Sequence, residues 1–150
     1  MEVKIKYLSP AIGDTIKPPF YATEGSAGMD LSACIDSPRT LNPGDKATIP
    51  TGIAIGLPSK AYVALIFARS GLGIKRGITM ANGVGVIDSD YTGEIMCGVV
   101  HLGSEPYTIY PGDRIAQMVF MPVTIATLIP ADKLEETDRG AGGLGSTGVK

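Results

Sequence analysis

Apolar and polar residues alternate with a period of two over several short stretches of the chain. Val3, Ile5 and Tyr7 alternate with Lys4 and Lys6, which predicts a half-buried strand near the N-terminus. Longer runs rich in β-branched and aromatic residues predict further strands. These runs cover residues 49–57, 61–68, 96–102 and 107–123; the second is expected to be deeply buried and the last to hold two strands around a turn.

Helical patterns are weak in this sequence. No segment keeps apolar residues at the i, i+3, i+4, i+7 spacing of an amphipathic helix, and only residues 134–137 suggest a single helical turn. The tripeptide Pro-Gly-Asp occurs at residues 43–45 and 111–113, each time before an apolar run, and predicts two similar type II turns. Short strands separated by frequent turns predict one all-β domain, a sandwich or a barrel.

Composition and charge narrow the class of protein. The chain has 150 residues, a net charge of −2, 20 glycines and 11 prolines, so it can form one domain and has no overall basic field for nucleic acid. It has no apolar run of membrane-spanning or signal-peptide length. Cys34 and Cys97 have no metal-binding spacing and are expected to be buried thiols. We therefore expect a cytoplasmic protein with no nucleic-acid or membrane partner.

Residues 81–94, with the sequence ANGVGVIDSDYTGE, are the centre of the predicted chemistry. An apolar stretch leads into three acidic residues, Asp88, Asp90 and Glu94, with Tyr91 among them. Three glycines allow sharp turns or the close approach of a ligand. The segment predicts a β-hairpin whose end holds a flat ligand beside a carboxylate base. A surface turn with solvated acids is the alternative.

The character of the chain changes at Arg139. The last residues, RGAGGLGSTGVK, include five glycines and little apolar surface, so they predict either a disordered tail or a lid that orders on a phosphate-bearing ligand. We therefore divide the chain into a β-domain, residues 1–138, and a tail, residues 139–150.

Five short segments, taken together in order, resemble the five motifs of the trimeric dUTPase family (deoxyuridine 5′-triphosphate nucleotidohydrolase). They include AGMDL, RSGL, IDSDYTG, GDRIAQM and GGLGSTG, and together they extend over nearly the whole chain. The matching segments are residues 27–31, 69–72, 82–93, 112–118 and 139–148. The resemblance implies a jelly-roll-like β-barrel that forms a homotrimer with shared active sites, a flexible C-terminal lid, and Mg²⁺-dependent hydrolysis of dUTP to dUMP and pyrophosphate. This reaction lowers dUTP and supplies dUMP for dTMP synthesis.

The resemblance also implies roles for individual residues. Asp88 resembles the general base that activates the attacking water, and Gln117 would position that water or a phosphate oxygen. Tyr91 would pack against the deoxyribose and exclude a 2′-hydroxyl, while Asn82 and the backbone near Val86 would bind the edge of uracil. The expected substrate-binding residues are Arg69, Ser70, Gly71, Leu72, Asn82, Gly85, Val86, Ile87, Tyr91, Met96, Arg139, Leu144, Gly145, Ser146 and Thr147.

Several residues keep two interpretations. Asp30 resembles the acid that contacts Mg²⁺ through water, from outside the coordination shell of the ion. Arg69 either reaches a phosphate or forms an ion pair at an interface, and Asp113 and Arg114 are expected to be structural. His101, the single histidine, is expected to be structural or exposed.

Leu144 departs from the family pattern, in which an aromatic residue of the tail stacks on uracil. Base–aromatic stacking is worth about 1–3 kcal/mol, so a leucine here predicts a weaker lid. Two other functions remain open at this point. They are a dCTP deaminase-like enzyme, against which the Arg69-Ser70-Gly71 sequence and Asp88 argue, and a regulator that binds dUTP without hydrolysing it.

Overall fold

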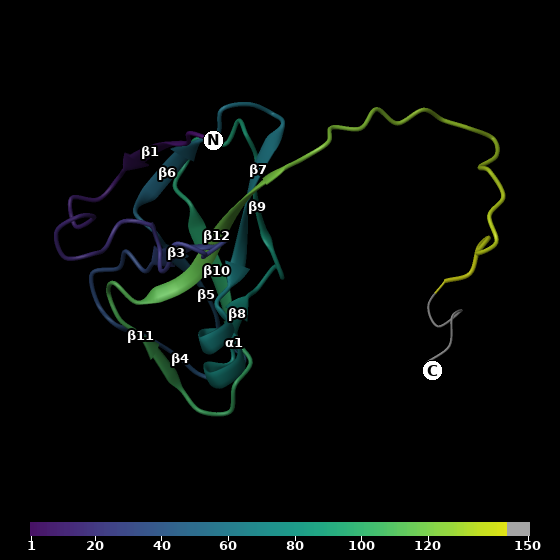
Figure 1. The fold of residues 1–150 in the computed structure, drawn as a ribbon. Helices are drawn as coiled ribbons and strands as arrows, with labels where there is room; N and C mark the ends of the chain where they lie inside the picture. The colour runs from purple at the N-terminus through teal and green to yellow at the C-terminus, as the bar shows by residue number, and fades with distance from the viewer. Residues whose placement is uncertain (144–150) are drawn as a thin grey trace.

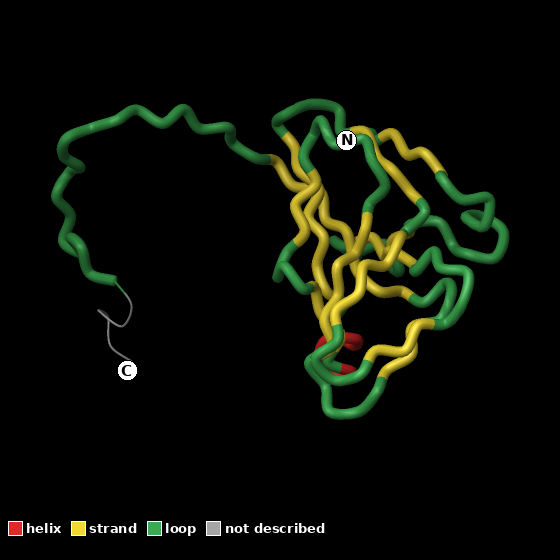
Figure 2. Tube along the Cα trace, turned by 180° about the vertical axis from the view of Figure 1, so that it is seen from behind, coloured by secondary structure: helices red, strands yellow, loops and turns green. Residues whose placement is uncertain are grey.

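The structure, a computed structural model, describes residues 1–143, which form twelve strands and one short helix. Figures 1 and 2 show a body made of strands, with the helix at one end and an extended C-terminal segment. The predicted all-β class is therefore confirmed, with one helix added. The elements are β1 (Lys4–Tyr7), β2 (Phe20–Tyr21), β3 (Met29–Ser32), β4 (Arg39–Leu41), β5 (Lys46–Pro50), β6 (Ile53–Gly56), β7 (Tyr62–Ala68), α1 (Ser70–Arg76), β8 (Ile78–Met80), β9 (Gly85–Ile87), β10 (Met96–His101), β11 (Tyr107–Ile109) and β12 (Arg114–Pro122).

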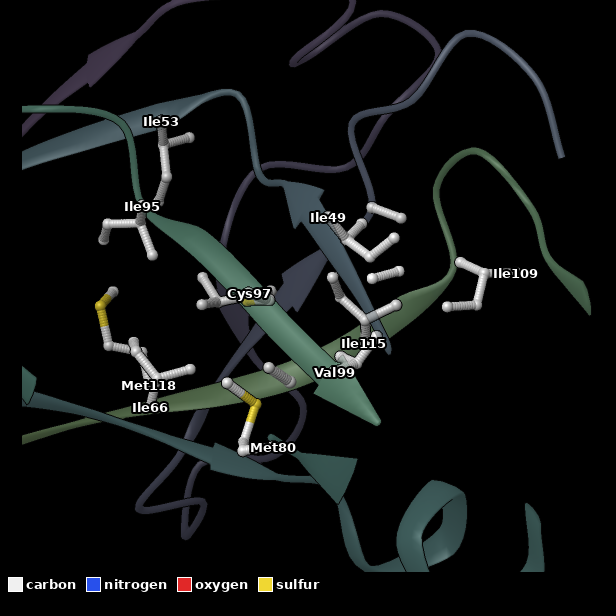
Figure 3. Close-up of a cluster of buried hydrophobic side chains, with 14 of the residues drawn as sticks. Ile49, Ile53, Ile66, Met80, Ile95, Cys97, Val99, Ile109, Ile115 and Met118 are labelled. Atoms are coloured by element: carbon white, nitrogen blue, oxygen red, sulfur yellow. The ribbon is translucent and has the colours of Figure 1, made fainter. Parts of the chain in front are cut away.

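Two larger antiparallel sheets enclose the core. One has the order β2-β3-β12-β7-β9 and the other β5-β10-β8, and two pairs, β1-β6 and β11-β4, complete the described sheets. Side chains at alternate positions of β10, Cys97 and Val99, face inward, as do Ile66 of β7 and Met118 of β12. Figure 3 shows these side chains from both sheets in one cluster. Burial of this apolar surface is the main source of stability of the fold.

Both predicted Pro-Gly-Asp turns are present and have the same construction. In each turn the aspartate accepts a backbone hydrogen bond from the residue before the proline, at 2.8 Å from Asn42 N to Asp45 Oδ2 and at 2.8 Å from Tyr110 N to Asp113 Oδ2. The glycines have φ of 89° and 81°, which a residue with a side chain rarely adopts. Asp113 thus has the structural role expected of it.

The predicted hairpin over residues 81–94 is wrong. β9 pairs with β7, whereas β10 pairs with β5 and β8, so the segment crosses from one sheet to the other. The turn that joins β8 to β9 contains Gly83 at φ 76°. Apolar alternation predicted the strands correctly, but it carries no information on which strand each one pairs with.

Five further expectations need correction. Residues 134–137 are exposed and have no regular secondary structure. The predicted strand at 49–57 is two strands separated by Thr51 and Gly52. β7 is less buried than expected, since only Ala64 and Ile66 are fully buried. β1 forms, but Ile5 is 44% exposed because β1 pairs only with β6 among the described strands and its faces stay open. Cys34 is half-buried, whereas Cys97 is fully buried.

The chain leaves the body after β12. Residues 123–138 are exposed and have no regular secondary structure, and Figure 1 shows them running away from the sheets. Within residues 1–143, no helix has the length and apolar character needed to cross a bilayer.

Candidate active site

A pocket of about 310 Å³ lies where β3, β7 and β12 come together, and we call it the Gln117 pocket. It brings together residues from three of the sequence motifs. Its lining is Ala22, Ser26, Ala27, Gly28, Asp30, Arg69, Ser70, Gly71 and Gln117.

The strand register fixes which face carries this pocket. Gln117 lies directly opposite Asp30 on β3 and Phe67 on β7, and residues opposite each other share a face. Their neighbours Leu31 and Met118 point into the core, so Asp30 and Gln117 point to the outer face of the five-stranded sheet. A β-bulge between residues 114 and 116 of β12 allows consecutive residues of the strand to be buried there. Gln117 still points to the outer face.

Asp30 is the most deeply buried charged group of the pocket, at 6% exposure. Its Oδ1 accepts a hydrogen bond from Arg69 Nε at 2.6 Å and its Oδ2 accepts one from Arg114 Nη1 at 2.9 Å. Arg69 Nη1 also donates to the Arg114 carbonyl at 3.3 Å. One carboxylate therefore holds two guanidinium groups together within the chain. Arg69 forms an ion pair there rather than at an interface, and Arg114 has a structural contact.

The predicted phosphate-binding segment turns out to begin α1. Its backbone N–H groups at Gly71 and Leu72 precede the first helical hydrogen bond, from Gly73 N to the Arg69 carbonyl, and no side chain caps them. Together with the Ser70 hydroxyl they can donate to an anionic ligand. The helix ends at Gly77, whose φ of 70° forms a left-handed cap.

The Gln117 amide is fixed by its surroundings. Its Nε2 donates to the Ala68 carbonyl at 3.0 Å. Its Oε1 lies over Gly28, where an added Cβ would come within 2.3 Å of that oxygen. Gly28 is thus required for the observed position of Gln117, a role that the sequence did not reveal.

A second pocket, of about 380 Å³, contains Asp88 and lies beside β7 and β9; we call it the Asp88 pocket. Asp88 follows the last residue of β9 and is exposed. The pocket also includes Val86, Asp90 and two residues that the sequence did not single out, Lys60 and Tyr62.

Tyr91 is held by its own turn. The phenol donates to the Glu94 carbonyl at 2.8 Å, and an added Cβ at Gly93 would come within 2.6 Å of the phenol oxygen. Tyr91 N also donates to the Asp88 carbonyl at 3.2 Å. The tyrosine and the candidate base are therefore parts of one compact turn.

The remaining residues predicted to contact the substrate differ in their burial and surroundings. Gly85 packs against β7, where an added Cβ would come within 3.0 Å of Ile66 Cβ, so its backbone contributes to strand packing. Asn82 and Met96 are exposed, and Ile87 is half-buried.

The described tail residues, 139–143, line neither pocket. Arg139 Nε donates to the Gly142 carbonyl at 3.1 Å within its own turn. The predicted tail contacts Leu144, Gly145, Ser146 and Thr147 lie outside the described residues.

The two pockets lie on the same sheet face but far apart. Ile87 lies opposite Ala64, three residues along β7 from Phe67, which lies opposite Gln117. At about 3.3 Å per residue and about 4.8 Å per strand, Ile87 and Gln117 are roughly 14 Å apart, and Asp88 is one residue further. A single water cannot hydrogen bond to both Asp88 and Gln117 of one chain at that distance.

His101 and Cys97 are unsuited to chemistry. His101 is buried, with Gly103 N donating to its Nδ1 at 3.1 Å and its Nε2 2.6 Å from the Glu105 carbonyl, so both ring nitrogens have structural partners. Burial raises the pKa of the Cys97 thiol to about 12, which keeps it protonated. Residues 1–143 contain no group of three or more His, Cys, Asp or Glu side chains placed to hold a metal ion.

The sequence of the chain is related to known enzymes over almost its whole length. The sequence model of the dUTPase family matches residues 14–148. The chain belongs to the dUTPase family. It is 54% identical to the deoxyuridine 5′-triphosphate nucleotidohydrolase of Desulfitobacterium hafniense (strain DSM 10664 / DCB-2), over 99% of this chain and 97% of that protein. The corresponding protein of Xanthomonas oryzae pv. oryzae (strain MAFF 311018) is 49% identical over 99% of this chain and 96% of that protein.

The fold agrees with that of a solved dUTPase. The Staphylococcus bacteriophage 80alpha dUTPase with dUPNHPP superposes with a TM-score of 0.86, at 26% identity, over 99% of both chains. The similarity thus extends to the three-dimensional arrangement of the strands.

Proposed function

We propose that this dUTPase hydrolyses dUTP to dUMP and pyrophosphate at a site assembled from the Asp88 pocket of one chain and the Gln117 pocket of another. The activity itself is supported by membership of the dUTPase family. The proposal that the site is shared rests on the separation of the two pockets on one sheet face. The reaction lowers dUTP and supplies dUMP for dTMP synthesis.

Asp88 is the proposed general base. Its carboxylate accepts a proton from a water molecule, whose oxygen attacks the α-phosphorus of dUTP. The bond from the α-phosphorus to the bridging oxygen breaks, and pyrophosphate leaves with the bond electrons. Gln117, fixed between Gly28 and the Ala68 carbonyl, would orient the same water or a phosphate oxygen.

The phosphates would lie in the Gln117 pocket. Ser70 and the N–H groups of Gly71 and Leu72 can donate to phosphate oxygens, and Arg69 places a positive charge beside them. These donors are fixed before the reaction, so they stabilise the charge that develops on the leaving pyrophosphate.

The base and the sugar would lie beside the turn after β9. Tyr91 would stack its ring against the deoxyribose, leaving no room for a 2′-hydroxyl. β9 is the edge strand of its sheet, so backbone groups on its open side are available to the uracil edge. A site that donates to uracil O4 would disfavour the amino group of cytosine.

The outer face of the five-stranded sheet favours association with a second copy. Between the two pockets it carries half-buried or exposed apolar side chains, and the exposed segment after β12 carries more, including Ile125 at 64% and Leu128 at 90% exposure. A neighbouring copy that covers this surface would also bring Asp88 near another chain's Gln117. The outer-face residues are Val63, Leu65, Phe67, Val86, Val119 and Met121.

The proposed assembly is the homotrimer of the family, in which each chain forms a jelly-roll-like barrel. Two larger antiparallel sheets around one core support the barrel. Free Cys34 and Cys97 thiols suit a reducing cytoplasm. Light scattering is expected to give the mass of three chains, and a stable monomer would contradict the shared site.

Mg²⁺ is the proposed cofactor. Asp30 is the single carboxylate that lines the Gln117 pocket, so the residues fit an ion whose ligands are mainly phosphate oxygens and water. When bound, Mg²⁺ would neutralise phosphate charge. Each Asp30 oxygen keeps a second lone pair besides its arginine contact, so Asp30 can still accept a hydrogen bond from a water of the ion.

The activity is tested by measuring pyrophosphate release from dUTP, dCTP, dTTP and UTP with Mg²⁺, and from dUTP with excess chelator. We expect rapid release from dUTP alone and its loss without the ion. Ammonia release from dCTP would instead indicate a deaminase, and tight dUTP binding without pyrophosphate would indicate a regulator.

The tail from residue 139 onward is the proposed lid over the nucleotide. Replacement of Leu144 by Phe is expected to tighten the lid, because a ring can stack on uracil, and to lower KM for dUTP by about tenfold, the lower part of the 1–3 kcal/mol range of base stacking. Leu144→Met, which has similar volume and no ring, is the control. Unchanged KM and kcat in Leu144→Phe would show that the residue does not contact the base.

A further inference from the structure

The turn that carries Asp88 and Tyr91 is attached to the core at Glu94. The half-buried Glu94 side chain accepts a hydrogen bond from Gly52 N, with 2.8 Å between N and Oε1. Gly52 lies 42 residues earlier in the chain, in the connection between β5 and β6. This long-range contact was not apparent from the sequence, in which Glu94 was one of three acidic residues.

Two more hydrogen bonds join the chain next to Glu94 to the connection between β5 and β6. Thr51 Oγ1 donates to the Ile95 carbonyl at 2.6 Å, and Ile95 N donates to the Ile53 carbonyl at 2.9 Å. Thr51 is 3% exposed and Ile95 is fully buried. The chain directly after Glu94 is thus held to the connection between β5 and β6 by buried contacts.

The Gly52 donor is itself rigidly placed. Gly52 has φ of 69°, and an added Cβ would come within 2.7 Å of Cys34 Sγ. The N–H group that Glu94 binds therefore belongs to backbone that is closely packed and conformationally restricted.

The other side of Glu94 reaches the proposed sugar contact. Tyr91 donates its phenol proton to the Glu94 carbonyl, and Gly93 leaves room for the phenol. The position of the Tyr91 ring consequently depends on the position of the Glu94 backbone, which the Glu94 carboxylate ties to Gly52.

We propose that Glu94 is a positioning residue that fixes the Tyr91 ring and thereby sets discrimination between dUTP and UTP. The inference rests on the proposed function, in which Tyr91 excludes the 2′-hydroxyl. Loss of the carboxylate leaves Gly52 N without its acceptor, and the backbone contacts of Ile95 then hold only the C-terminal end of the turn. The part of the turn before the Glu94–Ile95 peptide can shift, so the ring can move away and admit a ribose.

The test compares kcat/KM for dUTP with kcat/KM for UTP in wild type, Glu94→Ala and Glu94→Gln. We expect the dUTP-to-UTP ratio to fall about tenfold in Glu94→Ala, the effect of losing one part-buried hydrogen bond that involves a charged acceptor. Glu94→Gln retains an oxygen acceptor for Gly52 N and is expected to keep the ratio within about twofold. Tyr91→Phe removes the phenol contact alone and is expected to lower the ratio as well.

The outcomes separate the inference from the function on which it rests. If wild type does not hydrolyse dUTP, the proposed function fails. If wild type hydrolyses dUTP and folded Glu94→Ala keeps the wild-type ratio, the positioning role is wrong. If Glu94→Ala does not fold, an unchanged ratio in Tyr91→Phe overturns the inference.

Discussion

Replacement of Asp88 by Asn is expected to reduce kcat for dUTP hydrolysis by about 10²–10⁴-fold, the usual contribution of a general base. Asn has nearly the same shape as Asp but cannot take the proton of the attacking water as a carboxylate does. Asp88 is exposed and follows β9, so the change should leave the fold intact. The measurement is single-turnover pyrophosphate release, together with the affinity for a non-hydrolysable dUTP analogue.

Asp90 provides the matched control for Asp88. It lies two residues away, is exposed and lines the same pocket, so Asp90→Asn changes the local charge equally. We expect Asp90→Asn to keep kcat within a few-fold of wild type. If Asp90→Asn lost activity and Asp88→Asn kept it, the general base would be Asp90 and not Asp88.

Replacement of Asp30 by Ala is expected to lower the free energy of unfolding by about 3 kcal/mol and to lower dUTP affinity. Removal of one partner from a buried ion pair typically costs about 3–5 kcal/mol, and the lower end applies because the Arg69 and Arg114 side chains are 27% and 45% exposed. Without the carboxylate, the two guanidinium groups repel each other and Arg69 loses its place beside Ser70.

Denaturant unfolding and nucleotide titration measure the two effects of Asp30→Ala. Asp36 is an exposed acid shortly after β3, so Asp36→Ala serves as a control and should remain near wild type. Equal stabilities of Asp30→Ala and Asp36→Ala would show that the ion pairs to Arg69 and Arg114 contribute nothing measurable.

The strands and turns of the fold were largely predictable, because each depends on a local pattern. The alternation of Cys97 and Val99 marks β10, and Pro-Gly-Asp marks two turns of identical construction. The helix α1 was not predictable, since its sequence contains Gly71 and Gly73, which disfavour helices. An added Cβ at Gly73 would make only ordinary contacts, 3.7 Å from the Ile78 carbonyl, so packing does not explain the glycine there.

The arrangement of the site depends on contacts that no local pattern contains. The motifs identified Asp30, Gln117 and Asp88, but the distance between them follows from the register of β7 with β9 and β12. Likewise, Glu94 and Gly28 acquire their positions from partners 42 and 89 residues away. Strand pairing had to be known before either residue could be given a role.

We propose that each active site combines the Asp88 pocket of one chain with the Gln117 pocket of another. Co-expression of Asp88→Asn with Gln117→Ala, each expected to be nearly inactive alone, tests this arrangement when dUTP hydrolysis by the mixed oligomers is measured. Random assortment in a closed ring leaves about one quarter of the sites with both halves intact, so about a quarter of wild-type activity should return.

A control pair should show no recovery. Asp88→Asn mixed with Tyr91→Ala carries both changes in the same half of the site, so every site stays defective. Recovery in the first mixture alone is the result that a shared site predicts. No recovery in the first mixture, with mixed oligomers demonstrated by mass spectrometry, would show that both halves act within one chain and that the sites are not shared.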